Sequence, residues 1–374
     1  MVSETRPDLS GRVFYLNTSL RTQIFLNLGM INTALVSYGM SGRVFHAPFI
    51  DLNPDFNLVG SWERSQKNIQ ARYPHTKSFE SYEEILNDPS IHLVIVNSPN
   101  DTHYEYTKRA LLAGKHVVTE KAFTVTVAEA EELDALAQKL NLKLAVYHNR
   151  RYDADFLTIQ KLIKEDAIGE FLDIQISFER YRTTLSPKVH KELPTPGAGV
   201  LFDLGPHLVD QALLLSGMPT HIFADLRIIR KVSLVDDYFT LLLYYPTHRI
   251  LLTSGMVYMQ QLPAYKIYGS KGCFIKYRAD IQEDELLADK IPTGPNWGVE
   301  PESKWGTLST DNNGETSTQI IPSLAGDYGQ FYSLMAAAIK HNAPVPTSAK
   351  HGADIIRVLE TARKSFAEKK IIAL

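Results

Sequence analysis

Short apolar runs alternate with helical patterns through the first 150 residues, and this alternation limits the folds open to the chain. Apolar runs of this length, bounded by turn residues, are typical of fully buried strands. Strands that alternate with helices at this spacing predict an α/β fold, a doubly wound parallel sheet with helices on both faces. The expected strands are Thr33–Ser37, Asn57–Trp62, Leu93–Asn97, His116–Thr119 and Lys143–Tyr147, and the expected helices include Tyr104–Ala113 and Val127–Leu140.

A glycine-rich turn follows the first of these strands. A strand, a glycine turn and a helix form the pattern that binds dinucleotides, and the N–H groups at the start of the helix bind the phosphates. Gly39 and Gly42 match the glycines that admit the pyrophosphate and allow close helix packing, whereas Ser37 stands where a first glycine is usual. A plain turn between strand and helix is the alternative. The turn consists of Tyr38, Gly39, Met40, Ser41 and Gly42.

The end of the second strand carries two opposing signals about the adenosine half of a cofactor. Glu63 would accept hydrogen bonds from free ribose hydroxyls, which favours NAD. Arg64 would pair with a 2′-phosphate, and Ser65 would donate one more hydrogen bond, which favours NADP. Either charged residue is alternatively an ordinary surface group, so these residues leave both cofactors open.

Polar residues also follow the third and fourth strands. The carboxyl ends of parallel strands form the edge of the sheet where ligands bind. A lysine there can act in acid–base chemistry or bind substrate hydroxyls, although a surface lysine is the alternative for Lys121. We expect the cofactor site to include Ser98, Pro99, Asn100, His103, Glu120 and Lys121.

The second half of the chain changes character. Phe171–Tyr181 alternates apolar and polar residues, which is typical of a half-buried antiparallel strand. The polar stretch Ile281–Asn313 is rich in Pro and Gly and is predicted to be a loop over a site or a subunit contact. We therefore expect an α+β domain with a largely antiparallel open sheet. Its further elements are strands at Phe223–Arg230, Tyr238–Tyr245, Ile250–Met256, Ala264–Tyr268, Phe274–Tyr277 and Ile371–Leu374 and helices at Asp153–Glu165 and Asp354–Lys369.

The stretch Gly197–Ser216 places an acid and a histidine within an apolar helical stripe. Asp203 and His207 are four residues apart, so on one helix they would share a face. Pro206 is tolerated only near a helix start, which puts the pair in a first turn. Such a pair is typical of an acid–base histidine with a carboxylate that sets its tautomer and pKa. A capped helix with a satisfied core histidine is the alternative.

Composition limits the remaining possibilities. The chain has 374 residues, a net charge of −3 and no basic run that would indicate nucleic acid binding. Cys273 is the only cysteine, which excludes an intramolecular disulfide and a cysteine metal cluster, and we expect no metal. No apolar run reaches the roughly 18 residues of a membrane span. These features favour a reducing, cytoplasmic location.

The chain divides by pattern into three parts. Residues 1–29 show no sustained period and lack the compact apolar core of a secretory signal. We expect them to be a poorly ordered leader or added extension with Met30 as the true start, or else a native N-terminal extension. Residues 30–150 form the expected dinucleotide-binding domain, and residues 151–374 the substrate-binding and oligomerisation domain.

Five short motifs occur in an order that resembles the Gfo/Idh/MocA oxidoreductases, most closely the subgroup that includes scyllo-inositol dehydrogenases. The resemblance covers nearly all of residues 31–374. Two departures are Ser37 for the first glycine and Ala122 for the usual proline after Lys121, where a cis peptide would be costly. The motifs are Tyr38–Gly42, Ser98–His103, Glu120-Lys121, His148–Arg151 and Asp203–His207.

The resemblance implies an NAD- or NADP-dependent dehydrogenase that acts on a secondary alcohol of an inositol-like polyol or sugar. Lys121, Asp203 and His207 would be the catalytic set. In this hypothesis His207 takes the hydroxyl proton, Asp203 orients His207 and favours its charged form, and Lys121 stabilises the alkoxide. The substrate would also contact Asn149, Arg151 and Tyr181. Because some members of the subgroup use NADP, we favour NADP over NAD.

Two other functions remain as alternatives, a dinucleotide-binding regulator without catalysis and an NAD-dependent glycosidase of the same family. The assembly is predicted from the strand Tyr238–Tyr245, which is largely apolar on both faces. An open sheet face with apolar residues needs cover. We therefore expect a homodimer or homotetramer built through that face, with no nucleic acid or membrane partner.

Overall fold

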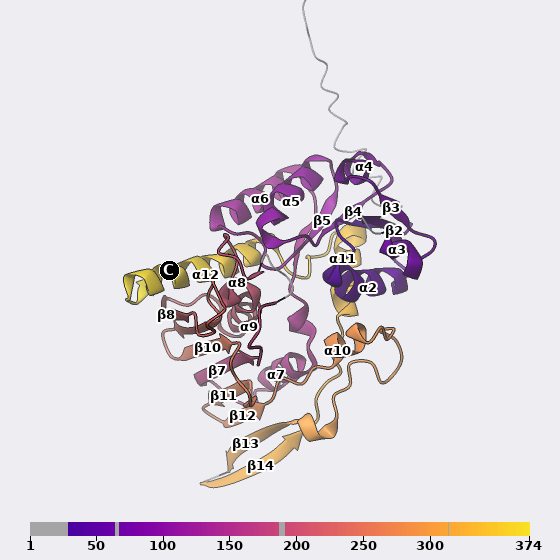
Figure 1. The fold of residues 1–374 in the computed structure, drawn as a ribbon. Helices are drawn as coiled ribbons and strands as arrows, with labels where there is room; N and C mark the ends of the chain where they lie inside the picture. The colour runs from indigo at the N-terminus through magenta and orange to yellow at the C-terminus, as the bar shows by residue number, and fades with distance from the viewer. Residues whose placement is uncertain (1–28, 64–66, 187–190, 313) are drawn as a thin grey trace, which may run out of the picture.

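The computed structural model describes residues 29–63, 67–186, 191–312 and 314–374 (Figure 1). Our expectation of a poorly ordered N-terminal extension falls on residues 1–28, outside the described part. Within these ranges no helix combines the length and the apolar character of a membrane span. The chain builds two sheets, and the segments that cover them come from both ends of the sequence.

The first sheet is the predicted doubly wound parallel sheet. Its strand order is β3-β2-β1-β4-β5-β6, and every neighbouring pair is parallel. The short edge strand β3 is the one strand of this sheet that we did not predict. The strands are β1 (Ile31–Leu35), β2 (Phe56–Trp62), β3 (Lys77–Phe79), β4 (Leu93–Val96), β5 (His116–Glu120) and β6 (Leu144–Tyr147).

Helices cover both faces of this sheet. One face packs on α5 and α6 through apolar side chains such as Ala110 and Leu133. The other face packs on α11 (Gly329–His341), which returns from near the C-terminus and which the sequence analysis missed. The helices between the strands are η1 (Gly42–His46), α2 (Ala47–Leu52), α3 (Asn68–Arg72), α4 (Tyr82–Asn87), η2 (Asn100–Thr102), α5 (His103–Leu112) and α6 (Val127–Leu140).

The second sheet is largely antiparallel, as predicted. Its order is β14-β13-β12-β11-β7-β10-β9-β8-β15, and only β7 and β10 pair in parallel. The strands are β7 (Phe171–Glu179), β8 (His221–Arg227), β9 (Tyr238–Tyr244), β10 (Arg249–Gly255), β11 (Tyr265–Gly269), β12 (Gly272–Lys276), β13 (Gly306–Asn312), β14 (Glu315–Ile321) and β15 (Ile372–Ala373).

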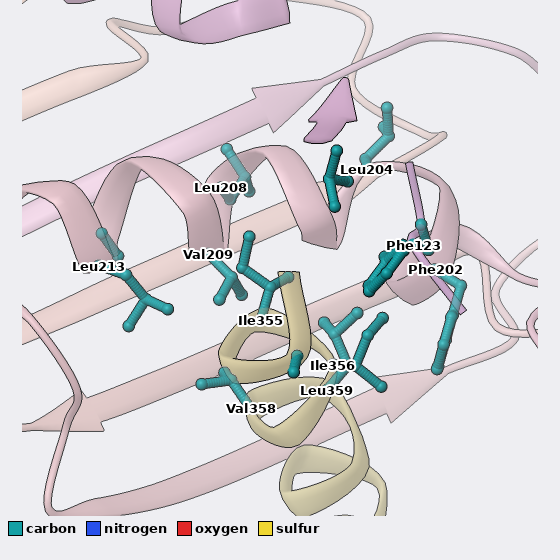
Figure 2. Packing of buried hydrophobic residues seen from close by; sticks show 14 of the residues in the cluster. Phe123, Phe202, Leu204, Leu208, Val209, Leu213, Ile355, Ile356, Val358 and Leu359 are labelled. Carbon is teal, nitrogen blue, oxygen red and sulfur yellow. The ribbon is translucent and has the colours of Figure 1, made fainter. Parts of the chain in front are cut away.

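One face of the second sheet packs on α9 and α12. Figure 2 shows Val209 of α9 beside Ile355 of α12, and both side chains are buried, as are those of Leu208 and Leu359. This layer fixes the start of α9 over the ends of the parallel strands. The remaining helices are η3 (Asn149–Tyr152), α7 (Ala154–Lys164), α8 (Val200–Asp203), α9 (Gly205–Ser216), α10 (Gln282–Leu287), η5 (Glu302–Lys304) and α12 (Ala349–Glu368).

The interpretation of Ile281–Asn313 as a loop is wrong for much of its length. It contains α10, η5 and β13, and β13 forms a hairpin with β14 at the edge of the second sheet (Figure 1). The hairpin is rich in Ser and Thr, and β14 is exposed at every residue except Ile321. The apolar alternation that reveals a half-buried strand is therefore missing from it.

Candidate functional site

A cavity of about 610 Å³ lies at the carboxyl ends of the parallel strands, where α8 and α9 approach them. It gathers most of the residues that the sequence analysis selected from separate motifs. Tyr38 and Gly42 belong to the same turn but do not line it. The selected residues that do line it are Ser37, Gly39, Met40, Ser41, Ser98, Pro99, Asn100, His103, Glu120, Lys121, Asn149, Asp203 and His207.

The glycine turn is closed by a reciprocal pair of hydrogen bonds between Ser37 and Asn97. The Ser37 N–H donates to Asn97 Oδ1 at 2.9 Å, and Asn97 Nδ2 donates to the Ser37 carbonyl at 2.7 Å. Ser37 Oγ also accepts the Gly39 N–H at 3.1 Å. These bonds stabilise the tight turn without the usual first glycine. Asn97, the last residue of a predicted strand, was not among the expected site residues.

The two glycines that remain have the roles expected of them. A Cβ on Gly42 would lie 2.3 Å from the Ser37 carbonyl oxygen, so only glycine allows the helix to pack this closely. A Cβ on Gly39 would meet only Ser37 Oγ, at 3.4 Å, so the loop is open on its cavity side. The first N–H groups of a helix have no carbonyl one turn earlier. The turn therefore fits the pyrophosphate of a dinucleotide.

Glu120 is held at the end of β5 by two side chains from the glycine-turn helix. Its Oε1 accepts a hydrogen bond from Ser41 Oγ and lies 3.0 Å from His46 Nε2. The other ring nitrogen of His46 lies 2.5 Å from the Tyr332 hydroxyl of α11. Burial opposes the charge on Glu120, but the bonds from His46 and Ser41 outweigh it and lower the Glu120 pKa to about 2. These contacts fix the end of β5 and therefore the position of the backbone of Lys121, the next residue.

Lys121 and Asp203 are in direct contact. Lys121 Nζ donates to the Asp203 carbonyl at 2.5 Å and to Asp203 Oδ1 at 3.2 Å. Lys191 forms a second ion pair with the same carboxylate oxygen. Burial lowers the Lys121 pKa, whereas the two lysines overcome the burial of Asp203 and hold its pKa well below its usual range. The Lys121–Ala122 peptide bond is cis.

His207 lies in the first turn of α9, next to Pro206, as predicted. Its partner differs from the expected one. Asp203 ends α8 and His207 belongs to α9, so the two do not share one helix, and Asp203 bonds Lys121 and Lys191 instead. Among the described residues, nothing hydrogen-bonds His207 Nδ1. Burial and then the charge of Lys121 lower the His207 pKa well below its usual range, so the ring is neutral.

The expected substrate contacts Arg151 and Tyr181 do not line the cavity. The Arg151 guanidinium instead pairs with buried Asp210, with Nη2 at 2.6 Å from Oδ1, and also donates to the Pro346 carbonyl. Tyr181 follows β7 and is 51% exposed. The sequence does not indicate which side chains of the short helix η3, or of the residues after β7, point toward the cavity. Asn149 alone of these three lies at the cavity.

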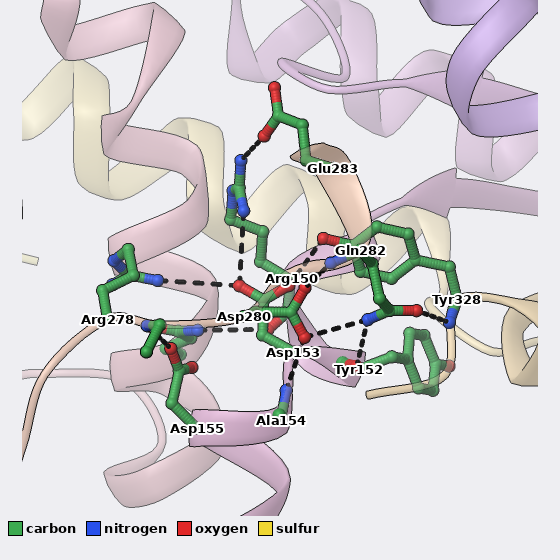
Figure 3. Close-up of polar contacts among 12 residues, drawn as sticks. Arg150, Tyr152, Asp153, Ala154, Asp155, Arg278, Asp280, Gln282, Glu283 and Tyr328 are labelled. Atoms are coloured by element: carbon green, nitrogen blue, oxygen red, sulfur yellow. Dashed lines mark hydrogen bonds and ion pairs between the residues drawn. The ribbon is translucent and has the colours of Figure 1, made fainter. Parts of the chain in front are cut away.

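Two arginines line the cavity in place of Arg151 and Tyr181. Each of them directly precedes the expected residue in the sequence. Arg150 Nη1 lies 3.4 Å from Asp153, and its Nη2 pairs with Glu283 of α10 (Figure 3). Arg180 also lines the cavity. Burial opposes the charge on Arg150, but Asp153 and Glu283 raise its pKa well above the ordinary value. The cavity wall therefore contains two arginines that were not among the expected site residues.

Glu63 has a structural role at the end of β2. Its Oε1 accepts the N–H of Asn68 at 2.8 Å, and its Oε2 accepts the Ile69 N–H at 3.2 Å and Ser78 Oγ at 2.9 Å. These bonds cap the start of α3 and restrict the carboxylate that we expected to bind ribose hydroxyls. Arg64 and Ser65 lie outside the described residues.

Comparison with known proteins identifies the family. The sequence pattern of an oxidoreductase family with an NAD-binding Rossmann fold matches residues 31–148, and the GFO/IDH/MocA C-terminal domain matches residues 156–275. The chain belongs to the Gfo/Idh/MocA oxidoreductases. This Gfo/Idh/MocA protein is therefore an NAD(P)-dependent oxidoreductase, and the α/β fold and the family resemblance predicted from its motifs are confirmed.

Several relatives match the Gfo/Idh/MocA chain over nearly its full described length. It is 38% identical to scyllo-inositol 2-dehydrogenase (NADP(+)) IolW of Bacillus subtilis, over 92% of this chain and 96% of the relative. The oxidoreductase yvaA of Bacillus subtilis superposes with a TM-score of 0.90 at 37% identity, covering 92% of this chain and 98% of its own. An oxidoreductase structure from Bacteroides fragilis is 42% identical, with a TM-score of 0.84 and coverage of 92% and 100%.

Proposed function

We propose that the protein transfers a hydride between NADP and a secondary alcohol of an inositol-like polyol or sugar. The observation that carries this proposal is the meeting of Lys121, Asp203 and neutral His207 in one cavity with the glycine turn. A neutral imidazole can accept the hydroxyl proton that must leave when the alcohol is oxidised. The name of the Bacillus subtilis relative, a scyllo-inositol dehydrogenase, supports the choice of substrate class.

The neutral and the charged side chains of the site have different roles in this reaction. Bound NAD(P) supplies the hydride chemistry. His207 takes the hydroxyl proton, and the Lys121 ammonium donates a hydrogen bond to the oxygen as negative charge develops on it. Asp203 acts on Lys121 rather than on His207, because its carboxylate holds Lys121 Nζ in place and favours its charged form. Asn149 at the cavity wall contributes a further polar contact for the substrate.

Two further features support NADP as the cofactor. Glu63 is engaged in capping α3, which reduces its capacity to bind a free 2′-hydroxyl. The Bacillus subtilis relative is named as an NADP(+) enzyme. On this view Arg64 and Ser65 clamp the phosphate. The other expected members of the cofactor site lie along the rest of the cofactor, namely Ser98, Pro99, Asn100 and His103.

The proposal is tested by a dehydrogenase assay across inositols and aldoses with NADP and with NAD. We expect reduced cofactor to accumulate with at least one polyol, and His207→Ala to lower kcat by about 10²- to 10⁴-fold without changing cofactor binding. Tight cofactor binding with no turnover of any polyol would favour a regulator. Release of an aglycone without net cofactor turnover would favour a glycosidase. Unchanged kcat in His207→Ala would remove His207 from the mechanism.

The expectations of domain limits, assembly and location remain proposals. We propose a division near residue 150, a homodimer or homotetramer built through the open face of the second sheet, and a cytoplasmic location. The assembly is supported by the register of that face, where Leu242 lies beside Phe223 on β8 and Leu251 on β10. Phe223 is 36% exposed, so this apolar cluster is accessible to a second copy.

A further inference from the structure

One cationic side chain of the cavity has no counter-charge bound to it. Arg180 directly follows β7, and its side chain lines the cavity. Its guanidinium stacks over the Phe178 ring, with Cζ at 4.9 Å from the ring centre. Within the described ranges, no hydrogen bond or ion pair engages that guanidinium. The five N–H donors of an arginine are therefore free for a bound molecule.

The neighbouring cations contrast with Arg180. Lys121 and Lys191 share Asp203, whereas Arg150 pairs with Glu283. Arg182, which also has no side-chain partner among the described residues, is exposed at the rim rather than within the wall. Arg180 thus differs from the other cations in being both shielded and unoccupied, and shielding without a partner is costly for a charged group.

The surroundings of Arg180 place it on the substrate side of the cavity. The charges that act on it most strongly are those of Asp203, Arg150 and Glu283, none of which belongs to the glycine turn. Asp203 in turn touches Lys121, the group assigned to the reacting oxygen. Burial lowers the Arg180 pKa, yet an arginine remains charged at neutral pH. The free donors therefore line the same cavity as Lys121, Asp203 and His207.

We propose that Arg180 holds the substrate by donating two parallel hydrogen bonds to a pair of adjacent oxygen atoms beside the reacting carbon. A planar guanidinium presents its N–H groups as a fork that matches such a pair. Neighbouring hydroxyls of a polyol and the carboxylate of a sugar acid both offer this chemistry. The inference rests on the proposed function and requires two adjacent oxygen atoms in its substrate. It gives Arg180 the substrate-holding role that we expected of Arg151.

The test pairs two variants with matched substrates. Arg180→Met keeps a long side chain over Phe178 but removes the donors, and Arg180→Lys keeps the charge without the fork. The substrates are an inositol, its analogue without the hydroxyl next to the reacting carbon, and gluconate. Arg249→Met is the control, because Arg249 lies on neighbouring β10 and pairs with Asp173 at the surface.

We expect Arg180→Met to raise the KM for inositol about 10- to 100-fold, as expected for loss of charge-assisted hydrogen bonds, with kcat nearly unchanged. An interaction made equally in the bound substrate and the transition state changes KM alone. The KM of Arg180→Lys for inositol should lie between those of the wild type and Arg180→Met. The KM of Arg249→Met should equal that of the wild type. With the deoxy analogue, Arg180→Met should cause no further loss. The Kd for NADPH, measured by fluorescence titration, should not change.

The outcomes separate this inference from the proposed function. If Arg180→Met raises the KM for inositol, vicinal hydroxyls are the partner of Arg180. If it raises the KM for gluconate alone, a carboxylate is the partner. Either result supports the inference. A KM that Arg180→Met leaves unchanged for both inositol and gluconate, an equal rise in KM with the deoxy analogue, or a raised Kd for NADPH would overturn it. If the wild type turns over no substrate with either cofactor, the proposed function fails. Calorimetry of inositol and gluconate binding to the NADPH complexes then tests Arg180 alone, and equal affinities in wild type and Arg180→Met would refute it.

Discussion

His207 shows how a residue can be recognised from sequence while its electrostatic state is misjudged. The spacing of Asp203 and His207 predicted a carboxylate that favours the charged imidazole. The break between α8 and α9 turns Asp203 toward two lysines, and burial keeps His207 neutral. A neutral ring is the form that a general base needs before reaction. Residue type and order were therefore predictable, whereas the pairing depended on a helix break that the apolar stripe concealed.

The pH dependence of oxidation follows from the lowered pKa values of His207 and Lys121. Because the His207 pKa is lowered, its basic form persists at pH values where an ordinary imidazole, with a pKa of about 6.5, would be largely protonated. The Lys121 pKa is also lowered by burial, so its charged form is lost at a lower pH than for an ordinary lysine. We expect kcat/KM to remain near its maximum at about pH 6 and to decline on the alkaline side below the usual lysine range. An acid limb centred on the ordinary imidazole pKa would contradict this assignment.

Arg64 carries the choice of cofactor in our proposal. A charge-assisted pair with a 2′-phosphate is worth roughly 1.5–3 kcal/mol. Arg64→Ala should therefore lower kcat/KM for NADP about tenfold or more and leave that for NAD unchanged. The ratio of the two efficiencies in wild type and variant measures this directly. An equal loss with both cofactors would mean that Arg64 stacks on the adenine and would remove the main support for NADP.

At the scale of elements, the strands β1, β4, β5 and β6 were predictable because they are short, largely apolar and buried at most positions of both faces. The hairpin β13–β14 was not, because its residues are polar and exposed and its position depends on distant partners. A buried ion pair holds the chain in place just before this hairpin. Lys276 Nζ lies 2.6 Å from Glu300 Oε2, and both side chains are fully buried.

This ion pair joins the end of β12 to the segment before η5. Lys276 Nζ also donates to the Lys304 carbonyl, and Glu300 Oε2 accepts Ser323 Oγ. Glu300→Gln would leave a buried ammonium without its counter-charge, and we expect a loss of about 3–5 kcal/mol in the free energy of unfolding. The measurement is the midpoint of urea unfolding.

Two controls test this explanation. Lys271→Met removes a surface ion pair between the turn that precedes β12 and Asp166, which follows α7, and should change the midpoint little. The double variant Lys276→Met with Glu300→Leu removes both charges and should recover most of the lost stability. A double variant as unstable as Glu300→Gln would show that packing, rather than the unpaired charge, causes the loss.

At the scale of the whole molecule, the open face of the second sheet predicts self-association. Leu242, Phe223 and Leu251 form adjacent apolar positions on three paired strands. We expect a homodimer or homotetramer in light scattering at micromolar protein concentration. Leu242→Lys should place a charge at the centre of that face and shift the protein to monomers without changing cofactor affinity. A wild-type monomer under these conditions would refute the prediction.

The position of α11 has a consequence for synthesis. The buried aromatic side chains Phe331 and Tyr332 cover one face of a sheet whose last strand ends at Tyr147. A ribosome that adds about 5–20 residues per second needs about 10 to 40 s to reach this helix after the sheet is complete. During that interval Phe56 of β2 and Tyr147 of β6 lack the aromatic partners that α11 supplies. The first sheet therefore acquires its full cover only after strands β7 to β14 of the second sheet have been synthesised.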